Sequence, residues 1–255
     1  MLILRRSLCA SPIAPRAGVC YTALKAPAGP FNTQRKGTLL MKNTLIFDLD
    51  GTLLNTLDDL TGAVNHALER HGFAQRESAE VASFLGHGFV WLIDRALPEG
   101  VDETAKRAVL EDFRTYYMEH CMDRTRPYDG IPALLTDLQK RGVRLAIVSN
   151  KGDAAVRELA AKYFPSVPVA VGERPDVRKK PAPDAVFAAL RALDTDPADA
   201  VYAGDSEVDA ETARNAALPC ILVSWGFRPR AQLAGLGAAA IADSPAELLA
   251  AFERL

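Results

Sequence analysis

The sequence predicts an α/β protein with a Rossmann-like parallel sheet core and an inserted helical cap domain. From residue 44 onward, short apolar runs of strand length alternate with stretches of helical periodicity, the pattern of a parallel sheet wrapped by helices. This alternation fails between residues 57 and 126, where the patterns are helical throughout. A stretch of about 70 residues suffices for a small domain. Because it follows the first strand directly, we expect an insertion.

The predicted core elements follow one another in strand–helix order. Strands are expected at 44–47, 144–149, 168–171, 200–203 and 220–224, and 239–242 would add a sixth. Helices are expected at 131–141, 154–163, 183–193 and 209–216. Because each helix joins one strand to the next, the crossovers should be right-handed.

The predicted cap has helical faces separated by glycines. One face carries Leu57, Leu60, Val64, Ala67 and Leu68. Helix breaks are expected at Gly72, Gly86 and Gly88. We therefore divide the chain into a core of 41–56 plus 127–255 and a cap of 57–126.

The first forty residues differ from the rest in charge and periodicity. They contain six basic residues, no acidic residue and several prolines, so residues 1–40 are expected to be a disordered basic extension. This segment is not translated if synthesis begins at Met41. An organellar transit peptide would also be basic, although serine is sparse here, and the early arginines fit a secretory signal poorly. Whether the segment is untranslated or a targeting signal stays open.

Composition favours small molecules as partners. Lys+Arg 30 against Asp+Glu 32 gives a net charge of −2, which argues against a dedicated binder of nucleic acid or of membrane surfaces. No segment approaches transmembrane length. The four cysteines show no paired short spacing, so neither a zinc site nor a disulfide framework is indicated. A reducing, cytoplasmic location fits best, and the oligomeric state is not indicated.

The first chemical motif places two carboxylates directly after a buried-type strand. Asp48 and Asp50 stand two positions apart in Phe-Asp-Leu-Asp-Gly-Thr, so they can face one site at the carboxyl end of a parallel strand, where ligands of open α/β sheets bind. Two such close carboxylates both stay ionised only beside a cation, which Mg²⁺ would supply. The alternatives are a surface turn and a calcium loop, whose glycine spacing differs.

Three further motifs follow predicted strands. Ser149 and Asn150 end the second strand, where a hydroxyl could hold a phosphate oxygen or simply cap a helix. Lys180 precedes a proline in a loop, and its ammonium suits a phosphate, although a solvated basic loop is the alternative. Asp205 ends another strand, and Asp209 follows four residues later. An acidic residue at this position could belong to a metal site or could cap the N-terminus of a helix. All four motifs should meet on one rim of the sheet.

Taken in order, the motifs Asp-x-Asp-Gly-Thr, Ser-Asn, Lys-Pro and Gly-Asp-Ser-x-x-Asp resemble the haloacid dehalogenase superfamily, and more closely its phosphoglycolate phosphatase-like branch. The resemblance covers the chain from about residue 41 to the end. It implies that Asp48 is the nucleophile and that Asp50 is the general acid and base, with its backbone carbonyl on the metal. Asp205 would be the further metal ligand.

The same resemblance assigns the remaining motif residues. It implies that Ser149, with Asn150, binds the transferring phosphoryl group, that Lys180 balances charge there, and that Asp209 supports the metal or the lysine. The implied activity is magnesium-dependent hydrolysis of a small phosphate monoester through an aspartyl-phosphate, with phosphoglycolate as the leading substrate. The helical insertion matches the first type of cap of this family.

The cap motifs point to no one substrate. Asn55 stands where many phosphoglycolate-type relatives carry an acid, which puts substrate identity in doubt. Gly86, His87 and Arg95 are the candidates for substrate contacts, unless the glycine merely breaks a helix. Opening and closing of the cap would admit substrate and exclude water.

Other activities were weighed against the chain. No cysteine has an arginine at the spacing that cysteine phosphatases need, and no P-loop is present. A sugar-phosphate mutase shares the fold, the cap and the motifs, so it stays open. A non-catalytic binding protein on the same scaffold should tolerate loss of Asp48 or Asp50, and both are present.

Overall fold

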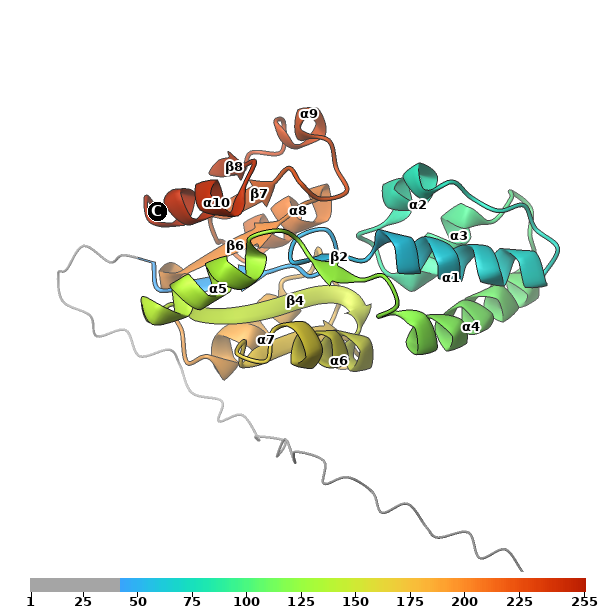
Figure 1. Cartoon of the computed structure of the whole chain (residues 1–255), viewed down its shortest axis with the longest axis horizontal. Helices are drawn as coiled ribbons and strands as arrows, with labels where there is room; N and C mark the ends of the chain where they lie inside the picture. The colour runs from blue at the N-terminus through green and yellow to red at the C-terminus, as the bar shows by residue number, and fades with distance from the viewer. Residues whose placement is uncertain (1–41) are drawn as a thin grey trace, which may run out of the picture. The chain divides into compact units, whose positions relative to one another are not determined.

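Six parallel strands form the central sheet, in the order β5-β4-β1-β6-β7-β8 (Figure 1). In this computed structural model the described residues are 42–255, so the extension predicted at 1–40 lies outside them. The strands are β1 (Thr44–Phe47), β4 (Arg144–Gly152), β5 (Val169–Glu173), β6 (Ala200–Gly204), β7 (Cys220–Val223) and β8 (Ala240–Ala242). The α/β class with a parallel sheet is confirmed, including the sixth strand.

The core helices lie on both faces of this sheet. They are α5 (Ile131–Lys140), α6 (Asp153–Tyr163), α7 (Asp184–Ala192), α8 (Glu207–Asn215), α9 (Arg230–Leu233) and α10 (Pro245–Phe252), with a short 3₁₀ helix at Pro197–Asp199. The first four follow the predicted helices within one or two residues, the uncertainty expected at helix ends. The two C-terminal helices and the 3₁₀ turn were not predicted.

The strands are apolar on both sides because each side packs against a layer of helices. In β1, Leu45 and Phe47 belong to the hydrophobic cluster that includes α5, α6 and α10, whereas Ile46 belongs to the cluster that includes α7 and α8. Successive side chains of a strand point to opposite faces, so a strand covered twice needs an unbroken apolar run. This requirement explains the patterns by which the strands were predicted.

The strand order brings three strand ends together. β1 pairs with β4 on one side and with β6 on the other, and Phe47 is in register with Ile147 and Ala203. The chain runs outward from β1 through β4 to β5 and then returns to β6 across β1. Such a reversal is a topological switch point, where ligands of open α/β sheets bind. The carboxyl ends of β1, β4 and β6 therefore border one site.

Four helices between β1 and β4 form the cap. They are α1 (Leu57–Arg70), α2 (Ser78–Phe84), α3 (Phe89–Ala96) and α4 (Glu103–His120), which pack on one another beside the core (Figure 1). Their apolar side chains form a hydrophobic cluster of their own, which includes the predicted face of α1 from Leu60 to Leu68. The predicted breaks at Gly72, Gly86 and Gly88 all have positive φ.

Two short strands connect the cap to the core. β2 (Leu54–Asn55) pairs antiparallel with β3 (Arg126–Pro127). Nearby, the buried carboxylate of Asp59 accepts hydrogen bonds from the backbone amides of Arg124 and Thr125, at 2.8–3.1 Å. The sequence analysis found helical patterns throughout 57–126 and so missed this ribbon, which includes Arg126. Strands of two residues carry no periodicity that a sequence pattern could reveal.

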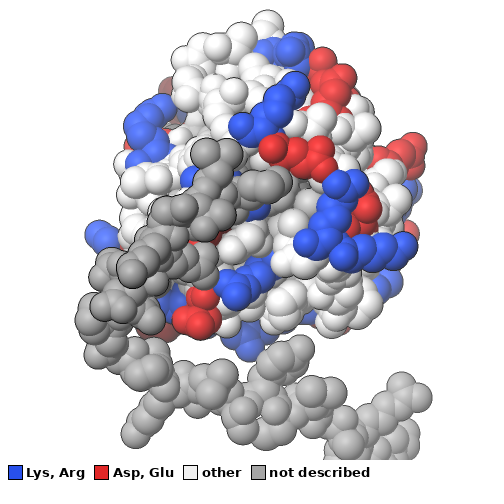
Figure 2. Space-filling view, turned by 90° about the vertical axis from the view of Figure 1, so that its left-hand side faces the viewer, with Lys and Arg blue, Asp and Glu red and all other residues white. Residues whose placement is uncertain are grey.

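Charges of both signs are interspersed on the face shown in Figure 2. This mixture agrees with the near balance of acidic and basic residues in the sequence. Among the described residues, no helix combines the length and apolar character needed to cross a membrane.

Candidate active site

The loop after β1 holds both carboxylates of the first motif. The backbone amide of Asp48 still bonds to Ala203 of β6 at 2.8 Å, so Asp48 is anchored to the sheet. Gly51 has φ +88°, and a Cβ at this position would lie 2.3 Å from the Asp205 carboxylate. Glycine is therefore required here by the backbone conformation and by the close approach of a second acidic loop.

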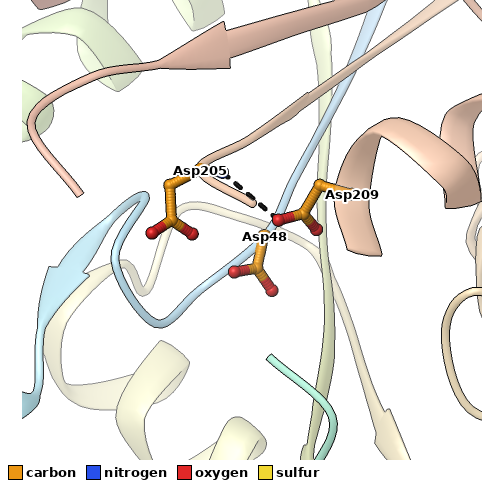
Figure 3. A group of neighbouring side chains, drawn as sticks. All are labelled: Asp48, Asp205 and Asp209. Carbon is orange, nitrogen blue, oxygen red and sulfur yellow. Dashed lines mark hydrogen bonds between the residues drawn. The ribbon is translucent and has the colours of Figure 1, made fainter. Parts of the chain in front are cut away.

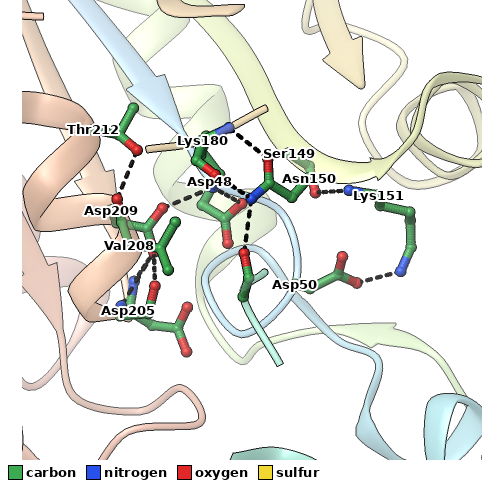
Figure 4. A network of polar contacts seen from close by, with 12 residues as sticks. Asp48, Asp50, Ser149, Asn150, Lys151, Lys180, Asp205, Val208, Asp209 and Thr212 are labelled. Atoms are coloured by element: carbon green, nitrogen blue, oxygen red, sulfur yellow. Dashed lines mark hydrogen bonds and ion pairs between the residues drawn. The ribbon is translucent and has the colours of Figure 1, made fainter. Parts of the chain in front are cut away.

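Lys180 links three groups beneath this loop (Figure 4). Its Nζ donates to Asp48 Oδ1 at 2.6 Å, to Asp209 Oδ1 at 2.8 Å and to the Tyr202 hydroxyl at 3.1 Å. All four side chains are buried. An ammonium has three N–H groups, so each one has an acceptor here, which a buried charge requires.

The charges in this array shift one another's pKa values. Burial raises the pKa of Asp48 to about 7, against the lowering effect of Lys180, and the nearby Asp209 and Asp50 raise it further. Burial also disfavours charge on Asp209, but Lys180 together with the Ser206 and Tyr202 hydroxyls holds its pKa below the usual value. Of the two carboxylates paired with Lys180, Asp209 is thus the more readily ionised, and Asp48 is the one that an added cation would ionise.

Asp48, Asp205 and Asp209 have carboxylate oxygens within 4.8 Å of one another (Figure 3). Asp205 is buried, and among the described residues its carboxylate receives one hydrogen bond, from the Phe227 amide at 2.7 Å. Burial and the two neighbouring carboxylates raise the pKa of Asp205 well above its usual value. Hard oxygen donors around an excess of negative charge are what a divalent cation such as Mg²⁺ needs. These residues therefore fit a metal ion.

Asp50 faces a different neighbour. Its Oδ1 accepts from Lys151 Nζ at 2.7 Å (Figure 4). The Thr56 hydroxyl donates to the same oxygen, also at 2.7 Å. Its side chain is 18% exposed, compared with 8% for Asp48. Both carboxylates line the same cavity, as the two-residue spacing predicts, but they belong to separate ion pairs.

Ser149 and Asn150 lie inside the last part of β4, next to Lys180, because this strand runs past its predicted end at 149 to Gly152. Asn150 Nδ2 donates to the carbonyls of Lys180 and Gly86, both at 2.9 Å, and its Oδ1 accepts from the Lys180 amide at 2.7 Å. The Asn150 amide therefore holds the Lys180 loop and a cap loop in place. The Ser149 hydroxyl accepts from the Lys151 amide at 3.1 Å and borders the cavity.

A cavity of about 40 Å³ lies between these core residues and the cap. Its core wall consists of Asp48, Asp50, Ser149, Asn150, Lys151, Lys180, Asp205, Ser206, Asp209, Phe227 and Arg228. Its cap wall consists of Leu60, Leu85, Gly86, Gly88, Phe89 and Leu92. Every cap residue in this wall is apolar or glycine.

The three cap candidates from the sequence have different positions. Gly86 lines the cavity, whereas His87 and Arg95 are not among its lining residues. The His87 ring lies 5.1 Å from that of Trp91, and the Arg95 guanidinium lies 5.9 Å from the same ring. Both polar side chains thus lie beside the exposed Trp91 of α3, the helix to which Arg95 itself belongs.

Arg228 connects the core to the cap. Its guanidinium donates to both carboxylate oxygens of Glu207, at 2.9 and 3.1 Å, and to the carbonyls of Ala82 and Leu85, both at 2.8 Å. These carbonyls belong to the last turn of α2 and its end. The sequence analysis missed Arg228 because its partners lie about 140 positions away in the chain.

Two other site residues were also missed. Lys151 directly follows Ser149 and Asn150 and pairs with Asp50, and its position next to a motif was the signal that could have identified it. Tyr202 lies in the middle of β6, where an aromatic residue is indistinguishable from ordinary core. Its hydroxyl donates to Asp209 at 3.0 Å.

This fold and site define a class of hydrolase. Residues 45–223 match the model of the haloacid dehalogenase-like hydrolases, and the chain belongs to this family. A phosphoglycolate phosphatase of Rhodospirillum rubrum is 34% identical over 217 residues, which cover 82% of this chain and 90% of that protein. An N-acetylmuramic acid 6-phosphate phosphatase of Pseudomonas aeruginosa is 30% identical, over 82% of this chain and 94% of that protein.

Solved structures agree with this assignment. A candidate phosphoglycolate phosphatase from Lactobacillus delbrueckii subsp. bulgaricus has a TM-score of 0.80 and 36% identity, covering 84% of this chain and 99% of its own. CbbY from Rhodobacter sphaeroides, solved in complex with phosphate, has a TM-score of 0.65 and 28% identity, over 84% of this chain and 100% of its own. With the family and these relatives, the chain is a phosphatase.

Proposed function

We propose that this phosphatase hydrolyses a small phosphate monoester through an aspartyl-phosphate on Asp48, with Mg²⁺ as cofactor and phosphoglycolate as the leading substrate. The observation that carries the proposal is the buried array in which Lys180 joins Asp48 to Asp209, beside Asp205. A carboxylate held at a strand end next to a fixed cation and a metal-type donor set suits in-line attack on phosphorus.

Asp48 and Asp205 would hold the metal, and the family resemblance adds the backbone carbonyl of Asp50. Asp209 lies in the same group of carboxylates, but its oxygens already accept from Lys180, Tyr202 and Ser206. Its proposed role is therefore to support the site. When bound, the cation would neutralise the carboxylates and the negative charge of the phosphoryl group.

The proposed reaction has two steps. In the first, an oxygen of Asp48 bonds to phosphorus as the ester bond breaks, and Asp50 gives its proton to the leaving alcohol oxygen. In the second, water bonds to phosphorus and loses a proton to Asp50, and the bond from phosphorus to Asp48 breaks. Inorganic phosphate leaves, and both carboxyl groups return to their initial states.

The remaining core residues would position the phosphoryl group. The Ser149 hydroxyl, with Asn150, would bind its oxygens, while the ammonium of Lys180 would offset its charge. Asn150 already spans the Lys180 loop and the Gly86 loop of the cap. It would therefore also link phosphoryl binding to the position of the cap.

The cavity favours a small leaving group. The two relatives named above act, by their names, on phosphate esters of very different size, phosphoglycolate and N-acetylmuramic acid 6-phosphate. A cavity of about 40 Å³ holds roughly three waters, at about 10–15 Å³ for each, which is less than either ester needs, so the cap must move to admit substrate. An apolar cap wall would leave the hydroxyl groups of a sugar without partners, which costs binding free energy. Phosphoglycolate, which carries no sugar, is preferred on the ground of the apolar cap wall.

The alternatives from the sequence remain as outcomes of an experiment. A sugar-phosphate mutase needs space and hydrogen-bond partners for a sugar, which the cap wall does not offer. A non-catalytic binding protein would not need an ion-paired Asp50 beside Asp48. A cytoplasmic location, without nucleic-acid or membrane partners, stays a prediction from composition.

The test is phosphate release by the full chain from a panel of small phosphate esters, with and without Mg²⁺. We expect magnesium-dependent release that favours phosphoglycolate and falls at least about 10⁴-fold in Asp48→Asn. Asp137→Asn is the matched control, because this carboxylate pairs with Arg141 on α5, away from the cavity. If no ester is hydrolysed, or if Asp48→Asn equals the parent, the aspartyl-phosphate proposal is wrong.

A further inference from the structure

Two buried lysines border the cavity, and they differ in how fully their ammonium groups are satisfied. Lys180 and Lys151 are 4% and 3% exposed. Lys180 has three oxygen acceptors, one for each N–H group. Within residues 42–255, the ammonium of Lys151 has one oxygen acceptor, Asp50 Oδ1 at 2.7 Å. A buried ammonium with unused donors carries a desolvation cost that a ligand could offset.

Aromatic rings of the cap surround the rest of this ammonium. Lys151 Nζ lies 4.8 Å from the ring centroid of Tyr117 and 5.6 Å from that of Phe89. These cation–π contacts stabilise the positive charge without using the remaining N–H groups in conventional hydrogen bonds. The Tyr117 hydroxyl is also buried and has no hydrogen-bond partner in the described part of the chain. Among the described residues, the Tyr117 hydroxyl and the remaining N–H groups of Lys151 are therefore side by side without conventional hydrogen-bond partners.

Among residues 42–255, no other cation in the cavity wall is available to a leaving group. The wall contains Lys151, Lys180 and Arg228. Lys180 is held between Asp48 and Asp209, and Arg228 is held by Glu207 and two cap carbonyls. Lys151 lies next to Asp50, the residue proposed to protonate the leaving oxygen. Its free donors are thus close to where the leaving group must emerge.

We propose that Lys151 is a specificity-determining residue that binds a carboxylate on the leaving group. The substrate class is then the phosphate esters of small hydroxy acids, in which the carboxylate lies one or two carbons from the ester oxygen. This inference rests on the proposed function and assigns one side chain to substrate selection. A carboxylate supplies two acceptor oxygens in little volume, which suits two unused donors in a small cavity.

The test measures kcat/KM for two substrates in the parent and in variants of the full-length enzyme, with Mg²⁺ present. Phosphoglycolate is compared with 2-hydroxyethyl phosphate, an ester of similar size whose leaving group is neutral. In Lys151→Met, kcat/KM for phosphoglycolate should fall about 10- to 150-fold more than kcat/KM for the neutral ester, the range for charge-assisted hydrogen bonds. Lys151→Arg, which keeps the charge, should recover part of the preference.

Lys162→Met is the matched control. Lys162 also lies over a tyrosine ring, at 5.1 Å from that of Tyr163, but it is exposed on α6. Its loss should leave the ratio of the two kcat/KM values unchanged. If Lys151→Met does not fold, as judged by thermal unfolding, Lys151→Gln is used, because it removes the charge but keeps a polar side chain.

An equal fall for both esters would overturn the inference, since Lys151 would then act through Asp50 alone. A parent enzyme that hydrolyses both esters without preference would overturn it as well. Both results differ from failure of the proposed function, in which the parent hydrolyses neither ester or Asp48→Asn keeps the parent's activity. The substrate ratio therefore tests Lys151, and Asp48→Asn tests the reaction.

Discussion

The two walls of the cavity have opposite chemistry. The core wall contains four aspartates and three cationic side chains, most of them buried and paired, whereas the cap wall contains four large apolar residues and two glycines. The core wall therefore supplies charge for phosphoryl transfer, and the cap wall supplies shape and excludes water. Where the two walls meet, Lys151 and Arg228 extend from the core to the cap.

The largest effect is expected when the central cation of the core wall is removed. In Lys180→Met, the carboxylates of Asp48 and Asp209 lose the ammonium that lies between them. An unpaired buried charge costs about 3–5 kcal/mol of stability, and kcat/KM should fall at least about 10³-fold. Kinetics and urea unfolding measure these changes.

Lys179→Met is the neighbouring control. Lys179 is exposed, and its ammonium donates to the His87 carbonyl at 3.3 Å. We expect changes below about threefold in kcat/KM and about 0.5 kcal/mol in stability, as for most surface substitutions. Equal effects of the two substitutions would contradict the conclusion that the core wall supplies the charge for phosphoryl transfer.

The next effect concerns the contact between the walls. Arg228→Gln removes two charge-assisted hydrogen bonds to the end of α2, so the closed position of the cap loses stabilisation. We expect kcat/KM to fall about 10- to 100-fold and the chain joining the cap to the core to become more susceptible to proteolysis. Arg230→Gln, which removes an exposed ion pair with Asp243, should change neither. Unchanged proteolysis in Arg228→Gln would argue against this role.

Proton release on metal binding tests the charge of the core wall. Burial raises the pKa of Asp48 from 3.8 to about 7 in the metal-free protein. Below pH 7, the cation must displace this proton, so the apparent Mg²⁺ affinity should rise with pH by about tenfold per pH unit for this group, and the raised pKa of Asp205, the second proposed ligand, adds to the rise. Calorimetry in buffers of different ionisation enthalpy measures both the affinity and the protons released. Equal affinity at pH 5.5 and pH 8 would contradict this prediction.

The smallest effect is expected from the cap wall. Leu85→Ala shortens an apolar side chain at the end of α2 and enlarges the cavity. We expect kcat/KM for bulkier phosphate esters to gain up to about 10-fold relative to phosphoglycolate, the lower end of the discrimination that one methylene group provides. Leu110→Ala is a matched change in α4, outside the cavity wall. The same substrate ranking in the two variants would show that the cap wall does not select by size.

Much of the core wall was predictable because its residues lie at or near the carboxyl ends of strands. Asp48, Ser149 and Asp205 each come directly after an apolar run, and parallel strands end at the same edge of a sheet. The cap wall was less predictable, because apolar residues on a helix give the same pattern whether they line a cavity or fill a core. Of the cap candidates, Gly86 lies in the wall, while His87 and Arg95 lie outside it.

The sequence by itself determined the fold class, the six strands and the positions of the four motifs, since periodicity and residue order are local properties. Only the tertiary structure decided which charges are paired. Lys151, Lys180 and Arg228 each have a partner that is distant in the chain, 101, 132 and 143 positions away respectively, and no sequence pattern encodes such contacts. Their energies depend on burial and distance, which exist only once the strands and the cap have assembled.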